Sequence, residues 1–121
     1  MGSCGQTIAP PAPGIEARAA TTGVPGDWDD LEASVLVGTS QAECVVVRRK
    51  IEEAGVAERF EIKHVSGRTG VLTARRGEDG EIVLVCEMGP LRDPALEALI
   101  VDRVRIRLGD LKGKEYAPIR G

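Results

Sequence analysis

The sequence has few aromatic residues, and this scarcity limits both its core and its function. Trp28, Phe60 and Tyr116 are the only ones in 121 residues. The core must therefore consist of Val, Ile, Leu and Ala, which are abundant between Val35 and Leu108. Proteins that bind single-stranded nucleic acid stack its bases on aromatic side chains. Since these are scarce and the net charge is −3, we expect no nucleic-acid partner.

Histidine, cysteine and long apolar runs are also scarce. His64 is the only histidine, so we expect no metal site and no cofactor. Cys4, Cys44 and Cys86 are an odd number without C-x-x-C spacing, which argues against a disulfide framework or a zinc finger. No apolar run approaches about 18 residues, and no secretory signal is recognisable. We therefore expect a cytoplasmic protein without membrane contact.

Proline and glycine divide the chain into three parts. Residues 1–27 are rich in Pro, Gly, Ala and Thr and offer little apolar surface, so we predict a flexible arm. Residues 28–111 have the composition of one folded α+β domain, with Trp28 as an anchor against its core. Residues 112–121 form a polar C-terminal tail.

The beginning of the domain is predicted to be a strand followed by a helix. Residues 34–37 are a short apolar run that stops at Gly38. Ser40 and Glu43 have the S-x-x-E spacing of a capping box, which opens a helix. Apolar residues then recur at helical spacing up to Ala54. We therefore predict a strand over 34–37 and a helix over about 41–54.

Three strands are predicted next. Residues 60–65 alternate between the two faces of a strand. Residues 71–76 and 81–88 flank an Asp79-Gly80 pair, which is a strong signal for a β-hairpin. Because residues 82–86 are apolar at every position, we expect the last of these strands to lie inside the sheet.

The C-terminal part of the domain allows two interpretations. Asp93 and Pro94 suit the N-cap and the first position of a second helix, which we predict over about 94–101. Residues 103–108 then alternate between arginine and an apolar residue, which favours a closing strand. The alternative is that the helix continues to Leu111, which leaves four strands and two helices.

These elements predict the fold class. With the closing strand, the order is strand-helix-strand-strand-strand-helix-strand. Compact arrangements of this order place two helices on one face of a mostly antiparallel sheet of four to five strands. We therefore predict a two-layer α+β sandwich of ferredoxin-like type.

The loop at residues 66–70 is the first candidate for a binding site. Gly67 and Gly70 free its backbone, and the side chains of Arg68 and Thr69 can donate hydrogen bonds to an oxyanion. A flexible hairpin turn would have the same pattern.

An arginine stripe is the second candidate. Arg103, Arg105 and Arg107 would line one face of the closing strand about 7 Å apart and could clamp a phosphate or carboxylate. Glutamates of the other strands could instead neutralise this stripe through cross-strand salt bridges. These glutamates are Glu61, Glu81 and Glu87.

Proton transfer and thiol chemistry have fewer candidates. His64 could transfer a proton, alone or paired with Cys86 if their strands are neighbours, and Glu87 is an alternative. Cys44 and Cys86 lie among apolar residues, so we predict that both belong to the core. Cys4 is expected to be the exposed, reactive thiol.

No set of these residues forms a catalytic constellation, so an enzyme is the less favoured class. Our first hypothesis is a small protein that acts through its surface, as a homo-oligomer or as an accessory or regulatory subunit of a complex. The alternative is a binder of, or an enzyme on, a small phosphate- or carboxylate-bearing ligand at the 66–70 loop and the 103–107 arginines. A third hypothesis is a thiol-based redox or transfer protein.

Overall fold

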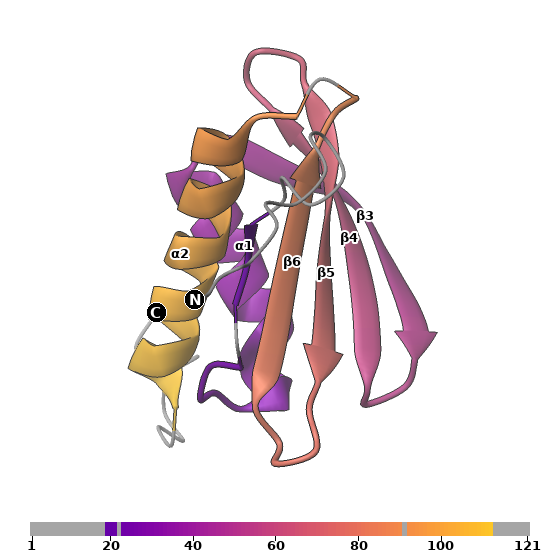
Figure 1. Ribbon diagram of the computed structural model, residues 1–121, viewed down its shortest axis with the longest axis vertical. Helices are drawn as coiled ribbons and strands as arrows, with labels where there is room; N and C mark the ends of the chain where they lie inside the picture. The colour runs from indigo at the N-terminus through magenta and orange to yellow at the C-terminus, as the bar shows by residue number, and fades with distance from the viewer. Residues whose placement is uncertain (1–18, 22, 91, 113–121) are drawn as a thin grey trace, which may run out of the picture.

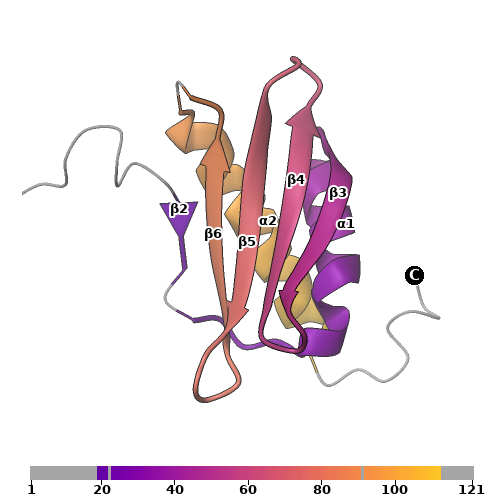
Figure 2. The ribbon, with the colours of Figure 1, turned by 90° about the vertical axis from the view of Figure 1, so that its right-hand side faces the viewer.

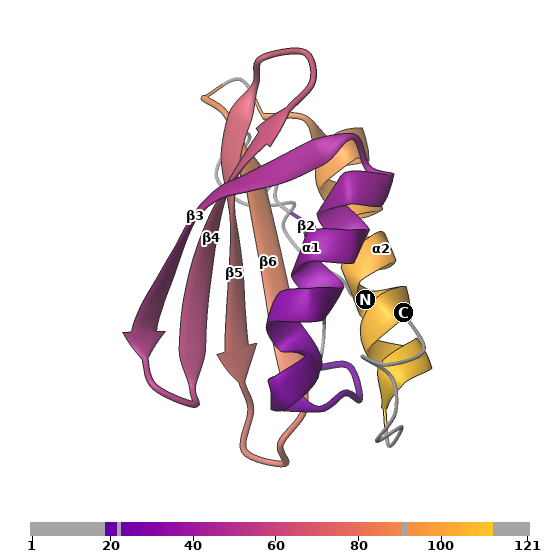
Figure 3. The same cartoon turned by 180° about the vertical axis from the view of Figure 1, so that it is seen from behind.

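The computed structural model describes residues 19–21, 23–90 and 92–112, which form one five-stranded antiparallel sheet and two α-helices (Figure 1). The strand order is β2-β6-β5-β4-β3. Both helices lie on the same face of the sheet (Figures 1 and 3). The elements in chain order are β2 (Ala19–Ala20), the 3-10 helix η1 (Trp28–Asp30), α1 (Leu31–Gln41), β3 (Cys44–Glu53), β4 (Ala57–His64), β5 (Thr69–Arg76), β6 (Ile82–Met88) and α2 (Pro94–Leu111).

The predicted α+β class is confirmed, but the predicted order of elements is wrong. Helix α1 comes before β3, and β3 to β6 follow one another as an antiparallel meander before α2. A ferredoxin-like sheet requires helices between its strands. The ferredoxin-like topology is therefore not confirmed.

The first two predicted elements are wrong, with helix and strand exchanged. Residues 34–37 lie in α1, and residues 44–53 form β3. The buried residues of α1 have helical spacing, but Ser34 and Gly38 are among them, so the stripe is not apolar in sequence. The predicted capping box, Ser40 and Glu43, lies at the end of α1 and not at the start of a helix. Glu43 has a φ of 63°, and the chain turns there into β3.

The three predicted middle strands are confirmed, with small shifts at their ends. They correspond to β4, β5 and β6. Helix α2 continues to Leu111, so the alternative reading of the C-terminal part is confirmed and the closing strand is wrong. The alternation over residues 103–108 suggested a strand, but its apolar residues Val104 and Leu108 are also four residues apart, which is one helical turn. Both are buried on one side of α2. Asp93 caps this helix by accepting a hydrogen bond from the backbone N–H of Leu96 at 3.1 Å.

The core lies between the helices and the sheet. Phe60 is its largest side chain, and aliphatic residues supply most of the rest. Cys44 and Cys86 are both buried, as predicted, and Trp28 packs against the core from its edge.

Helices α1 and α2 cross in close contact at Gly38. A Cβ atom at this position would lie 2.6 Å from Cγ2 of Val104 and 2.7 Å from its backbone nitrogen. Only a residue without a side chain allows this approach, so Gly38 sets the distance between the two helices.

The predicted arm and tail are described only in part. Ala19–Ala20 pairs with β6 at the edge of the sheet, and Val24 exchanges two backbone hydrogen bonds with Ile82. Residues 1–18 and 113–121 lie outside the described residues, as do Cys4 and Tyr116. Neither α1 nor α2 combines the length and the apolar content that crossing a bilayer requires.

We predict that Gly38→Ala destabilises the protein by about 1–3 kcal/mol, because the added methyl group forces α1 and α2 apart. Urea unfolding measures this change. Gly109→Ala in α2 is the control, because a Cβ atom there meets nothing within 4 Å. The control should be neutral or stabilising, and equal destabilisation by both variants would contradict the role of Gly38.

Candidate functional site

The loop 66–70 connects β4 and β5 and lies beside the start of α2. Its Arg68 forms an ion pair with Asp93, the residue that caps α2. Arg68 and Thr69 line a hollow of about 260 Å³, to which Arg92 also contributes. The structure therefore brings two of the predicted binding residues into one small concavity.

Arg92, the second arginine at this hollow, holds a buried carboxylate. Its Nε and Nη2 atoms donate hydrogen bonds of 2.9 and 3.0 Å to the two oxygens of Glu97, which is fully buried in the first turns of α2. Glu97 also accepts a hydrogen bond of 2.8 Å from the backbone N–H of Met88, at the end of β6. This carboxylate therefore ties α2 to the sheet.

The environment of Glu97 favours its charged form. Burial alone would raise the pKa of this carboxyl, but the hydrogen bonds from Arg92 and from the backbone of Met88 and Asp93 outweigh it and lower the pKa. Both arginines at the hollow are thus paired with carboxylates of α2 or its cap. Each pairing reduces the attraction of this hollow for an anionic ligand.

The predicted arginine stripe does not exist. Arg103, Arg105 and Arg107 lie on α2, where side chains two residues apart point in nearly opposite directions. Arg105 pairs with Asp102 on the same helix. The helical rise places Arg103 roughly 15 Å along α2 from Asp93, so these arginines do not join the 66–70 loop.

His64 belongs to a local turn. Its Nδ1 atom lies 2.8 Å from the hydroxyl oxygen of Ser66 and 3.1 Å from the backbone nitrogen of the same residue. Its Nε2 atom lies 4.0 Å from a carboxylate oxygen of Glu43. The proposed pair with Cys86 does not form, because β5 separates their two strands.

The two buried cysteines are poor nucleophiles. Burial, followed by the charge of Glu97, raises the pKa of the Cys86 thiol to about 12. Burial also raises the pKa of Cys44. Since the thiolate is the reactive form, neither residue supports the thiol-based hypothesis.

The face of the sheet opposite the helices is uncovered within the described residues (Figure 2). We call this surface the open face. Pairing between strands assigns its members, because residues opposite one another point to the same side. They are Val45, Val47, Arg48, Lys50, Arg59, Glu61, Lys63, Thr69, Val71, Thr73, Arg75, Val83, Val85 and Glu87. Val47 has no register partner and is assigned through the hollow that it lines with members of this face.

Valines form the apolar part of the open face. Val45 and Val47 on β3 are 60% and 56% exposed, and Val71, Val83 and Val85 are partly exposed. A solvent-facing side of an antiparallel sheet usually carries polar residues. Valines in these positions depart from that pattern and make this part of the open face apolar.

Positive charge dominates the open face although the whole chain has a net charge of −3. It carries five cations against Glu61 and Glu87, with Glu53 at its rim. Lys50 reaches Glu52 at 3.9 Å. The other four cations form no ion pair with any described residue, and they are Arg48, Arg59, Lys63 and Arg75.

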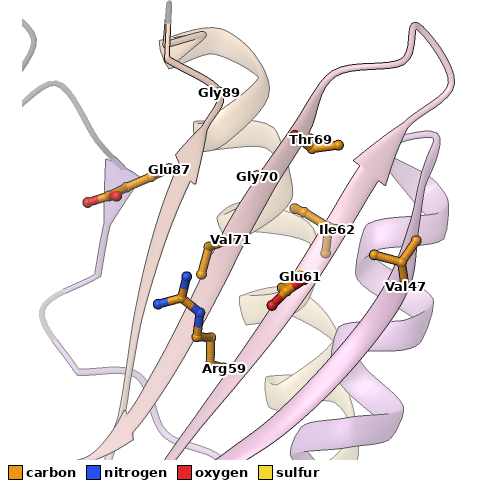
Figure 4. A pocket seen from close by; sticks show the side chains of 9 residues that line it. All are labelled: Val47, Arg59, Glu61, Ile62, Thr69, Gly70, Val71, Glu87 and Gly89. Carbon is orange, nitrogen blue, oxygen red and sulfur yellow. The ribbon is translucent and has the colours of Figure 1, made fainter.

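A shallow hollow of about 570 Å³ lies on the open face, across β3 to β6. Figure 4 shows the side chains of Arg59, Glu61 and Val71 along its floor, with Val47 on the β3 side. Gly70 and Gly89 contribute only backbone at its upper end. The hollow thus offers a cation, a carboxylate and apolar groups side by side.

Sequence reasoning missed this face because its edge strand was predicted to be a helix. In a helix over residues 41–54, Arg48 and Lys50 would point in different directions into solvent and would not share a surface with the other cations. The run Val45–Val47 was the available signal, since consecutive β-branched residues favour a strand. With β3 in place, alternation along β3, β4 and β5 would have grouped the cations.

A comparison with models of known protein families gives no match, and neither does a comparison with curated protein sequences. The described residues also contain no group of three or more His, Cys, Asp or Glu side chains that could hold a metal ion. The candidate site is therefore assigned from its own geometry, and the open face is the strongest candidate.

We predict that Glu97→Gln destabilises the protein at pH 7 by about 1–3 kcal/mol, because a buried charged partner of Arg92 and Met88 is weakened. The folded-state pKa of Glu97 is lowered, so its stabilisation is present above the ordinary value of 4.5 and is lost as pH falls through the folded-state pKa. The difference between wild type and variant in urea unfolding should therefore shrink in acid.

Glu78→Gln in the exposed β5–β6 turn is the control for this experiment. It should change the free energy of unfolding little at any pH. A Glu97→Gln variant whose destabilisation grows in acid would contradict the assignment.

We also predict that Cys86 resists alkylation in the folded protein. A pKa of about 12 lowers the thiolate fraction at neutral pH by about a thousandfold relative to the ordinary value of 9.0. Iodoacetamide labelling followed by peptide mass spectrometry, with and without urea, measures this protection. Rapid labelling of Cys86 without urea would restore the thiol-based hypothesis.

Proposed function

We propose that this protein is an accessory or regulatory subunit that holds a protein partner on its open face. The observation that carries the proposal is the row of exposed valines on a sheet face that no described element covers. Burial of such side chains stabilises an interface, whereas their exposure costs free energy in water.

A second copy of the chain suits this face less well than another protein. Two open faces packed together would bring their cations into contact, and like charges in a desolvated interface cost several kcal/mol. The remaining surface of the chain is acidic. The charges therefore permit self-association only if the open face of one copy packs against a different, acidic surface of the other copy. We therefore favour a different protein as the partner.

The free edge of β3 is a weaker docking site than the face. The pairing of β3 with β4 shifts at two points, between Val46 and Arg48 and between Ile51 and Glu53. Bulges and charged residues on an edge strand discourage the addition of another strand. The edge of β3 has both features.

The alternative function, a small anionic ligand at the 66–70 loop, has less support. Arg68 and Arg92 line the hollow there, but Asp93 and Glu97 already pair with them. The arginines of α2 lie too far along the helix to contribute. A phosphate or carboxylate would have to displace one of these ion pairs.

The test is co-purification and native mass spectrometry of Val45→Asp/Val47→Asp. Both side chains are more than half exposed, so the substitutions should not unfold the protein. We expect the variant to lose a partner that the wild type retains. Leu36→Asp is the matched control, because Leu36 is 48% exposed on α1, on the other side of the sheet.

Two results would contradict the proposal. One is a partner that both variants retain or both lose to the same extent. The other is a wild-type mass at a multiple of 12.8 kDa with no second protein, which would indicate self-association.

A further inference from the structure

A segment of a partner that binds on the open face must pair its backbone N–H and C=O groups within itself. Strands β3 to β6 use their N–H and C=O groups to pair with one another in the plane of the sheet. A segment that lies on the face therefore finds no backbone partner there, and buried backbone groups without partners are costly. A helix pairs its backbone internally, whereas an extended segment does not.

The cations of the open face form a belt around Glu61, which is the register partner of Arg48 and lies between Lys63 and Arg59 on β4. The pairing register places them in the order Lys63, Arg48, Lys50, Arg59 and Arg75, across three neighbouring strands. From the rise along a strand and the spacing between strands, neighbouring members lie about 5–8 Å apart, and the belt is about 20 Å long. It follows mainly the strand direction.

Two members of the belt are directly opposed. Lys50 on β3 is the register partner of Arg59 on β4, and both are exposed. Like charges opposite one another in a sheet destabilise it. An anionic group above this pair would reduce the repulsion, and among the described residues Lys50 has only the 3.9 Å contact with Glu52 to offset it.

The valines flank this belt on both sides. Val45 and Val47 lie on β3, and Val71, Val83 and Val85 lie on β5 and β6. An occupant must therefore present apolar groups and carboxylates on one surface. Residues three and four apart on a helix lie about 5–6 Å from each other, which matches the spacing of the belt.

We propose that the open face binds an acidic amphipathic helix of the partner protein. The helix lies along the strands, as α1 and α2 do on the opposite face (Figures 1 and 2). Its carboxylates pair with the belt, its apolar residues cover the valines, and about 14 residues span the belt. Glu61 and Glu87 set its register by repelling carboxylates from their positions. This inference rests on the proposed function, because it specifies the chemistry of the same surface.

The test uses two synthetic 18-residue peptides and the full chain labelled with ¹⁵N. Both peptides are amphipathic and helical, but one carries glutamate and the other lysine at the border of its apolar face, where these side chains can reach the belt while the apolar residues cover the valines. We expect the glutamate peptide to shift amide signals of β3, β4 and β5 and to bind more weakly as salt increases. We expect the lysine peptide to produce no such shifts.

Matched variants separate the belt from general positive charge. Arg48→Gln/Arg59→Gln should weaken binding of the glutamate peptide by about tenfold or more. Arg103→Gln/Arg105→Gln removes the same charge from α2 and should leave binding unchanged. All four arginines are exposed, so both double variants should fold normally.

Four results would overturn this inference. They are equal binding of both peptides, no binding at about 1 mM, equal effects of the two arginine pairs, and stronger binding of single-stranded DNA at the same amides. Its failure is distinct from failure of the proposed function. If Val45→Asp/Val47→Asp loses the cellular partner while Arg48→Gln/Arg59→Gln retains it, the face is correct and the acidic helix is wrong.

Discussion

The close approach of α1 and α2 at Gly38 is the contact on which the arrangement of this protein depends. Because Val104 packs directly against the backbone of α1, the two helices form one layer that covers a single face of the sheet. Their buried residues, with those of β4 to β6, complete a core that needs only one large aromatic side chain. No described helix lies on the second face, which is the open face.

The two sides of the sheet differ in whether their charged side chains are paired. Beneath the helices, Glu97 is buried with several hydrogen-bond donors, and its negative charge joins the end of β6 to α2. On the open face, Arg59, Arg48, Lys63 and Arg75 form no ion pair with any described residue, whereas Lys50 reaches Glu52. One charge is satisfied within the fold, whereas the others are available to a partner. This difference distinguishes a structural charge from the charges of the proposed binding surface in the same small domain.

The proposed function follows from that difference. Glu97 is buried with its oxygens bonded to Arg92 and to the backbone of Met88, whereas Lys50 and Arg59 are like charges opposite one another on the open face. Valines beside the pair add an apolar contact surface without adding specificity of their own. In the proposed complex, apolar area supplies the driving force for association, and the cations select the partner.

Local sequence signals were sufficient for β4, β5, β6 and the start of α2, because alternation, the Asp79-Gly80 turn and the Asp93 cap act over a few residues. The mixture of expected helices and strands was likewise enough for the α+β class, and the apolar neighbours of Cys44 and Cys86 in the sequence were enough to predict their burial. Tertiary structure decided residues 31–53, because the buried stripe of α1 contains Ser34 and Gly38 and is recognisable only once α2 is seen packed against it. It also decided the site, because the open face combines residues of four strands whose proximity depends on the sheet as a whole.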